Sequence, residues 1–272
     1  MKPVTVKESE RDSMRTLFDA IARAYDAYRP GYPDALIADI VKLSSIPAGG
    51  RILEVGCGTG QATLPFAQRG YEIIAVEMGE SMAAIARQKM REVPNVEIVT
   101  AKFEDWEPGD RKFDLVISAT AFHWIAPQTG YPKAAQVLRP RGAIAIFSNI
   151  HPHPFTGYFE RVQSVYREVL PDNKDPNEWP TVEQVIEDGS EEIRASRCFD
   201  EPSVHRYPWS QEYDRDAYLN LMATSSFQLN LEESIRKRLQ DGLGRVMDEE
   251  YGGRVTHPYL SVLHFAKKMV RS

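Results

Sequence analysis

A loop of three glycines, Gly56, Gly58 and Gly60, follows a short apolar run at residues 51–55 and leads into a helical pattern. A strand that turns through glycines into a helix lets the backbone approach a ligand that side chains would exclude, and the helix amides add a weak positive field. A dinucleotide fold needs glycine or alanine three residues beyond the second glycine, and that position is Gln61. The loop therefore predicts a ligand site whose spacing disfavours a dinucleotide. A turn that only reverses the chain is the alternative.

Acidic and aromatic residues follow the next two predicted strands. Glu77 ends the strand predicted over residues 71–76, where a carboxylate can accept hydrogen bonds from both ribose hydroxyls of an adenosine ligand. Phe103 and Glu104 follow the strand predicted over residues 96–99, and this pair suits an adenine face and its exocyclic amine. The alternative for Glu77 is a surface glutamate that begins a loop. The alternative for Phe103 and Glu104 is a capped turn.

His123 and Trp124 lie just beyond a fourth predicted strand, residues 113–118. In open α/β sheets, ligands bind at the carboxyl ends of the strands. A histidine in that place titrates near neutral pH and can act as a general base, while the tryptophan can form an aromatic wall. His123 is therefore the candidate catalytic residue. A histidine with a purely structural role is the alternative.

Metal and disulfide chemistry are not predicted. His151 and His153 have the spacing of metal ligands, but no acidic or thiol residue is near them in the sequence. Cys57 and Cys198 are far apart and outside any Cys-x-x-Cys spacing, which argues against a disulfide framework and a structural zinc site.

The elements that must position these residues alternate along the first half of the chain. We predict helices over residues 18–25, 34–43, 61–68, 80–91 and 131–138, and strands over residues 51–55, 71–76, 96–99, 113–118 and 143–147. Strands separated by helices predict a parallel sheet with right-handed crossovers, and hence the α/β class.

The pattern changes after residue 149. We predict helices over residues 155–170, 181–193, 214–224 and 232–247, and strands over residues 204–209 and 255–266. This predicts three parts: an α/β core with an N-terminal lid helix (1–150), a mainly helical cap or substrate region carrying one core strand (151–250), and a final core strand (251–272). The whole is a seven-stranded sheet with helices on both faces and a helical cap.

The composition excludes several classes of protein. Of the 272 residues, 42% are hydrophobic and 26% are charged, which is the balance of a soluble globular protein. A formal net charge of −6 argues against a surface that binds duplex DNA or RNA. The apolar runs are too short to cross a bilayer, and the charged N-terminus lacks the apolar core of a signal peptide. We therefore expect a cytoplasmic protein that binds neither nucleic acid nor membrane.

Four parts of the sequence resemble the successive motifs of class I S-adenosylmethionine-dependent methyltransferases: residues 52–60, Glu77, residues 113–116 and residues 138–143. The similarity runs from about residue 18 to residue 147. Its most specific part combines residues 25–33 with residues 119–124, and this combination is similar to trans-aconitate methyltransferase-like enzymes, which act on small molecules. Arg141 departs from the pattern, because the family more often has two consecutive glycines in that turn. It touches the sheet edge rather than the cofactor.

The resemblance implies a Rossmann-like sheet whose last strand is antiparallel, with S-adenosyl-L-methionine as cofactor and S-adenosyl-L-homocysteine as product. The residues expected to bind the cofactor are Arg29, Gly56, Gly58, Thr59, Gly60, Gln61, Glu77, Met78, Met82, Phe103, Glu104, Ala119 and Thr120. Those expected to pack around the sulfonium or the methyl acceptor are Tyr25, Tyr28, Tyr32 and Trp124, through cation–π attraction. Arg29 can pair either with the methionine carboxylate or with an acidic substrate.

We therefore expect an enzyme that transfers a methyl group from S-adenosylmethionine to an oxygen or nitrogen of a small molecule, with a carboxylic acid favoured by the resemblance. A carboxylate needs no base, whereas a phenol or alcohol needs one, and His123 is then the candidate. The alternatives are a non-catalytic S-adenosylmethionine-binding protein and a nicotinamide-dependent reductase, the latter disfavoured by Gln61. The expected oligomeric state is a monomer or homodimer.

Overall fold

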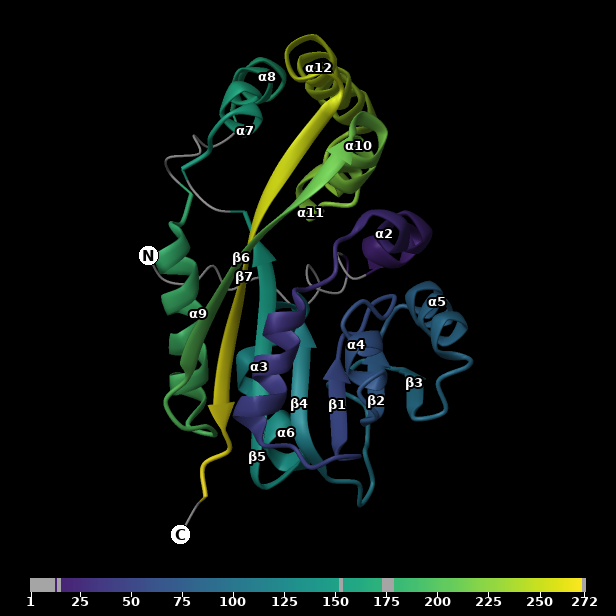
Figure 1. The fold of residues 1–272 in the computed structure, drawn as a ribbon, viewed down its shortest axis with the longest axis vertical. Helices are drawn as coiled ribbons and strands as arrows, with labels where there is room; N and C mark the ends of the chain where they lie inside the picture. The colour runs from purple at the N-terminus through teal and green to yellow at the C-terminus, as the bar shows by residue number, and fades with distance from the viewer. Residues whose placement is uncertain (1–12, 14–15, 152–153, 173–178, 271–272) are drawn as a thin grey trace.

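The computed structural model describes residues 13, 16–151, 154–172 and 179–270, which form an α/β fold around one mixed sheet (Figure 1). Its seven strands lie in the order β3-β2-β1-β4-β5-β7-β6. Neighbours from β3 to β5 are parallel, and β7 is antiparallel to both β5 and β6. The predicted fold class and the antiparallel last strand are both confirmed. The strand bounds are β1 (Arg51–Val55), β2 (Glu72–Glu77), β3 (Val96–Thr100), β4 (Phe113–Ala119), β5 (Leu138–Ile150), β6 (Ser203–Asp214) and β7 (Arg254–Lys267).

Helices cover both faces of the sheet, and successive residues of β1 show why. Ile52 packs into a core with α3 (Asp34–Ser44), α4 (Thr63–Ala67) and α5 (Glu80–Met90), whereas Leu53 packs into a second core on the other face. That second face is covered by α6 (Pro127–Val137) and α9 (Val182–Ser196). A parallel sheet has both faces buried, so its strands are apolar on both sides.

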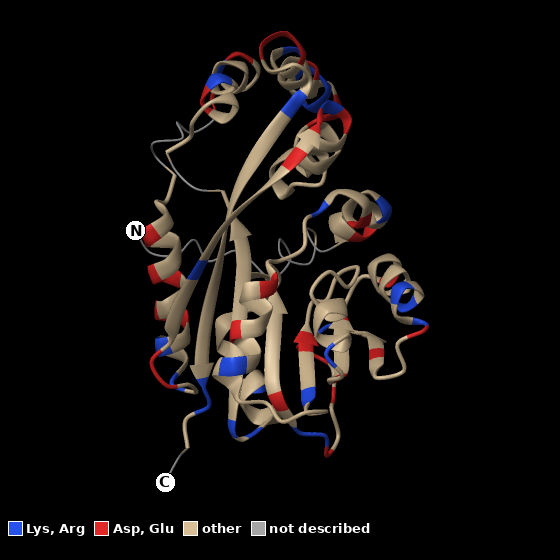
Figure 2. Cartoon of the chain, viewed as in Figure 1, with Lys and Arg blue, Asp and Glu red and all other residues tan. Residues whose placement is uncertain are grey.

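The helix α9 illustrates how a local pattern sets one of these layers. Thr181 and Gln184 form a capping box at its N-terminus, with each side chain bonded to the other's backbone N–H. Ile186 and Ile193 are buried against the core, while a row of acidic residues lies along the helix in Figure 2. The amphipathic pattern therefore fixes which side of the helix meets the sheet.

The strands β6 and β7 continue beyond the rest of the sheet. The pairing of β5 with β7 ends at Ile150↔Leu260, but the pairing of β6 with β7 continues to Asp214↔Arg254. The projecting ribbon carries the cap: α7 (Tyr158–Arg161), α8 (Gln163–Val169), α10 (Arg215–Ala223), α11 (Ser226–Leu229) and α12 (Glu233–Tyr251) (Figure 1). The helix α2 (Ala22–Tyr28) packs against both α10 and α5, and so bridges the cap and the core.

Some predicted elements have different bounds in the structure. The helix predicted over 155–170 is two short helices that meet at Val162, and the strands β5 and β6 are longer than predicted. The extra residues of β6 and the C-terminal extension of β5 follow from pairing with β7, which offers partners to polar residues that show no strand pattern by themselves, while Leu138 at the start of β5 pairs with Phe113 of β4. Within the described ranges, no helix combines the length and apolar character needed to cross a bilayer.

Candidate active site

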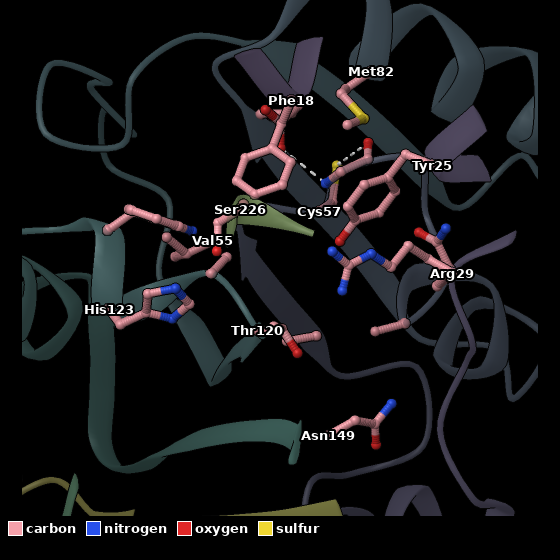
Figure 3. A pocket seen from close by; sticks show the side chains of 18 of the residues that line it. Phe18, Tyr25, Arg29, Val55, Cys57, Met82, Thr120, His123, Asn149 and Ser226 are labelled. Atoms are coloured by element: carbon pink, nitrogen blue, oxygen red, sulfur yellow. Dashed lines mark hydrogen bonds between the residues drawn. The ribbon is translucent and has the colours of Figure 1, made fainter. Parts of the chain in front are cut away.

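A cavity of about 340 Å³ lies at the carboxyl ends of β1, β2 and β4, where it is bordered by α2 and the cap. Residues from both ends of the chain line it, and Figure 3 shows Arg29 and His123 approaching it from opposite sides. Its volume lies within the range of small-molecule pockets. The position is the one that open α/β sheets use for ligands.

The glycine loop after β1 adopts backbone conformations that favour glycine. The φ angles of Gly56, Gly58 and Gly60 are +70°, +56° and +89°. A Cβ atom on Gly56 would lie 2.5 Å from the Cβ of Ala121, so that position has no room for a side chain. A Cβ on Gly58 would meet only the Tyr25 ring, at 3.9 Å, and would project into the cavity. Because Gly58 has no side chain, the backbone of the loop leaves an open cradle in which a ligand can approach it.

Glu77 holds this loop against the end of β2. Its two carboxylate oxygens accept hydrogen bonds from the backbone N–H groups of Gly58 and Gly79, each at 2.8 Å. Burial raises the pKa of Glu77, and the two N–H donors partly offset the rise. Each oxygen retains a lone pair, so the carboxylate can accept further hydrogen bonds from a ligand in the cavity.

A second carboxyl group, that of Glu54, lies just before the loop. It is fully buried, and burial raises its pKa to about 7, with the Thr63 side chain lowering it and the Glu77 charge raising it. Burial also raises the pKa of the neighbouring Cys57 thiol well above its ordinary value. Burial therefore disfavours the charged forms of both titratable groups at the start of the loop, the Glu54 carboxyl and the Cys57 thiol.

The segment before α3 is fixed to the sheet edge by polar contacts. The hydroxyls of Tyr32 and Thr120 are 2.7 Å apart, and the Tyr32 ring packs edge-on against Phe147 at 4.8 Å. Thr120 has a φ of +53°, and its N–H donates to the carbonyl of Phe147 at 2.8 Å. Asn149 donates from Nδ2 to the carbonyl of Gly31 at 2.9 Å.

Arg29 connects the end of α2 to the cap. Its Nε donates to the hydroxyl of Thr224 at 2.9 Å, and its Nη2 donates to the Thr224 carbonyl at 2.6 Å. The guanidinium lies 5.2 Å from the centre of the Tyr25 ring. Phe18 makes edge-on contacts with both Tyr25 and Trp124, at 6.0 and 5.9 Å between ring centres. The three aromatic rings and the Arg29 guanidinium together line this part of the cavity.

The structure brings most of the predicted site residues together. Those that line the cavity are Tyr25, Arg29, Tyr32, Gly56, Gly58, Gln61, Glu77, Met78, Met82, Phe103, Glu104, Ala119, Thr120, His123 and Trp124. Thr59, Gly60 and Tyr28 are outside the lining. Thr59 is fully buried, and Tyr28 packs against the cap's apolar cluster. His123 is exposed on a 3-10 turn (Phe122–Trp124) at the cavity.

The sequence reasoning missed a second set of lining residues, which we call the cap side: Asn149, His151, Leu221, Met222, Ser225, Ser226, His257 and Tyr259. The alternation of Val255, His257 and Tyr259 in a predicted strand shows that they share a face, but not what that face meets. The metal-ligand spacing of His151 and His153 remains without a structural test, because His153 lies outside the described residues.

The opposite set, the glycine side, fits an adenosine-type ligand. It consists of Gly56, Gly58, Gln61, Glu77, Met78, Met82, Phe103 and Glu104. Gln61 has a buried amide nitrogen with no hydrogen-bond partner in the described part of the chain, so a ligand acceptor atom would satisfy it. With the open cradle at Gly58 and the carboxylate of Glu77, the donors and acceptors match a nucleoside with ribose hydroxyls.

Comparisons with known proteins agree with this geometry. Residues 52–142 match the methyltransferase domain family. A Mycobacterium tuberculosis relative described as an uncharacterized methyltransferase is 24% identical over 253 residues, which cover 93% of this chain and 91% of the relative.

Two solved structures share the fold. The YcgJ protein from Bacillus subtilis has a TM-score of 0.55 at 16% identity, covering 87% of this chain and 99% of that one. Phosphoethanolamine N-methyltransferase 2 of Haemonchus contortus, solved with phosphomonomethylethanolamine and S-adenosylhomocysteine, has a TM-score of 0.55 at 15% identity and covers 98% of this chain and 61% of that one.

Proposed function

Because the chain is a class I S-adenosylmethionine-dependent methyltransferase, we propose that it methylates an oxygen or nitrogen atom of a small molecule held in the cavity, with a carboxylic acid as the favoured acceptor. The charge distribution of the cavity carries this proposal. Among the described residues that line it, the carboxylates are Glu77 and Glu104, both on the glycine side, and the cations are Lys102, next to Phe103, and Arg29, which lies between the two sides. An anionic acceptor therefore meets a cation, whereas a cationic amine would find no carboxylate on the cap side.

The glycine side is the proposed cofactor site. Glu77 would accept hydrogen bonds from the ribose hydroxyls, Phe103 and Glu104 would face the adenine, and Gly58 would allow close approach of the loop. Bound S-adenosylmethionine supplies a methyl group that is already activated by its sulfonium. The protein's own task is therefore to align the acceptor and exclude water, and alignment alone can be worth several kcal/mol.

Arg29 is assigned to the carboxylate of the acceptor. Two of its nitrogens are held by Thr224, which fixes the direction of the guanidinium and leaves Nη1 as a further donor. Burial raises the pKa of Tyr259 on the cap side, and the Arg29 charge partly offsets that rise, so the charge reaches this side of the cavity. A carboxylate is ionised at neutral pH and needs no base, which leaves His123 as a base only for a phenol or alcohol.

The test is turnover with matched acceptors. Purified protein is incubated with S-adenosylmethionine and a set of small carboxylic acids, phenols and primary amines, and released S-adenosylhomocysteine is measured by mass spectrometry. We expect turnover with acids, and an acceptor KM at least about 10-fold higher in Arg29→Gln, from loss of a charge-assisted hydrogen bond. Turnover confined to amines would contradict the acid proposal. An unchanged acceptor KM with weaker S-adenosylhomocysteine binding would move Arg29 to the cofactor.

The two alternatives predicted from the sequence gain no support from the comparisons. The matched family and the relative reported above are methyltransferases, and neither is described as a reductase or as a binding protein. Titration of the protein with NAD(P)H beside S-adenosylhomocysteine tests the first alternative directly, because a reductase would bind the nicotinamide cofactor.

A further inference from the structure

One imidazole on the cap side, that of His257, is packed by aromatic rings on its face and on its edge. Tyr259 stacks on it with ring centres 4.1 Å apart and planes at 20°, and Trp209 stacks on Tyr259 at 4.7 Å and 22°. His151 and Phe159 meet the His257 ring edge-on, with centres 4.7 and 4.8 Å away. The ring is 6% exposed and lines the cavity, so it has one defined orientation there.

The hydrogen bond that His257 makes decides which of its nitrogens can bind a ligand. Nδ1 lies 2.9 Å from the carbonyl oxygen of Pro258. A carbonyl oxygen can only accept, so Nδ1 carries the proton and Nε2 of the neutral ring keeps its lone pair. None of the described residues makes a hydrogen bond to Nε2, and this nitrogen is not among the fully buried atoms without a partner, so it is accessible from the cavity that His257 lines. An accessible acceptor atom in a cavity can be paired by a ligand group that donates to it.

The ring is neutral at physiological pH. Burial, and to a smaller extent the neighbouring His151, lower the pKa of His257 to about 3, while the hydrogen bond to the Pro258 carbonyl acts in the opposite direction. So weak a base does not remove a proton from an alcohol or a phenol. A hydroxyl group that donates to Nε2 would therefore remain protonated, and the methyl group would be transferred to another part of the same molecule.

We propose that His257 is an acceptor-binding residue whose Nε2 accepts a hydrogen bond from a hydroxyl group, so that the substrates are hydroxy acids methylated on the carboxylate. This rests on the proposed function, because Arg29 is there assigned to the carboxylate. Methylation joins the methyl carbon to a carboxylate oxygen and breaks its bond to sulfur, which keeps the bonding electron pair. No proton moves, and the hydroxyl serves only in recognition.

The test uses pairs of acids that differ by one hydroxyl: malate with succinate, 3-hydroxybutyrate with butyrate, and 2-hydroxybenzoate with benzoate. The rate of S-adenosylhomocysteine release gives kcat and KM for each. We expect the wild-type protein to favour the hydroxylated member of at least one pair by about 10-fold in kcat/KM, because only that member can donate a hydrogen bond to Nε2. His257→Phe keeps the aromatic stack and should remove the preference by raising the KM of the hydroxylated acid alone.

Two further variants separate recognition from structure. His257→Gln can present an amide oxygen in the cavity and should restore part of the preference. His205→Phe changes a histidine on the neighbouring strand β6 that is outside the cavity lining, and should leave the preference intact. An equal loss of kcat/KM for both acids of a pair in His257→Phe would overturn the role of His257. An unchanged preference for the hydroxylated acid in that variant would overturn it as well.

The outcomes also distinguish this inference from the proposal on which it rests. Equal turnover of both members of every pair by the wild-type protein would overturn the hydroxyl assignment and leave the acid proposal standing. Turnover of no acid, with S-adenosylhomocysteine still bound, would overturn both. Histidine-selective ¹⁵N NMR gives a readout independent of activity: the neutral Nδ1–H form of His257 is expected, and a neutral Nε2–H form would contradict the inference.

Discussion

On the glycine side of the cavity, the lining comes from one segment of chain between Gly56 and Glu104, whereas the cap side brings together segments that are far apart in the chain. Gly58 and Glu77, which are hydrogen-bonded through a backbone N–H, are 19 residues apart. Arg29 and Thr224, which join the lid helix to the cap, are 195 residues apart. A ligand common to many enzymes can be bound by a local backbone arrangement, while the choice of acceptor can be changed by replacing cap side chains without disturbing that arrangement.

The largest effect is expected where the backbone itself binds. Gly58→Val places a side chain in the cradle and strains a residue at φ +56°, so S-adenosylhomocysteine binding should become undetectable by calorimetry. Gly49→Val is the matched control, because Gly49 has a φ of +68° with no atom near its Cβ position and is exposed away from the cavity. Similar affinities in the wild-type protein and Gly58→Val would show that the loop is not the binding element.

A second effect should appear in stability rather than in binding. Burial raises the pKa of Glu54 to about 7, so the folded state holds a proton that the unfolded state loses near its ordinary value. The contribution of Glu54 to the free energy of unfolding therefore falls as pH rises from about 4.5 to about 7, by about 3 kcal/mol in all. Glu54→Gln removes this dependence. Denaturant unfolding at pH 5 to 8 should show the variant gaining on the wild-type protein by about that amount.

The control for this measurement is Glu72→Gln, at the exposed start of β2. Its carboxylate makes an ion pair with Arg51 in which both side chains are about half exposed. Such pairs contribute at most about 1 kcal/mol, so this variant should show only a small pH-dependent difference from the wild-type protein. Parallel pH profiles for the wild-type protein and Glu54→Gln would contradict a raised pKa at Glu54.

The smallest effect is expected at His123, the residue that the sequence singled out for catalysis. With a carboxylic acid as acceptor, His123→Ala should leave kcat within about 2-fold of the wild-type value, and the pH–rate profile should keep its shape. A general base would cost about 10²- to 10⁴-fold. A loss of that size, with a limb of the pH profile lost near the ordinary histidine pKa, would restore His123 as the base and point to a phenol or alcohol.

The contrast between the two sides also explains what the sequence could predict. Gly58 and Glu77 were predictable because Gly58 follows one short apolar strand and Glu77 ends the next, and the carboxyl ends of parallel strands meet at one edge. The seven strands and the antiparallel β7 were predicted correctly, with bounds that differ by several residues in β5 and β6. Whether each predicted residue performs its assigned role stays a prediction.

The cap side could not be predicted in the same way. His257 and Tyr259 were placed in a strand, but their contact with the cavity depends on the part of β7 that extends beyond β5 and on the helices packed there. These are tertiary contacts between segments far apart in the chain. His151 was considered only for its spacing from His153, and nothing in that spacing indicates its contact with His257.

The most direct test of the account is the calorimetric Kd of S-adenosylhomocysteine for three proteins in one buffer: the wild type, Glu77→Gln and His257→Phe. We expect micromolar affinity for the wild-type protein. Glu77→Gln should weaken it by about 5- to 150-fold, because charge-assisted hydrogen bonds worth about 1–3 kcal/mol are lost, while His257→Phe should change it by less than about 2-fold. Unchanged affinity in Glu77→Gln together with weakened binding in His257→Phe would contradict the division of the cavity into a cofactor side and an acceptor side.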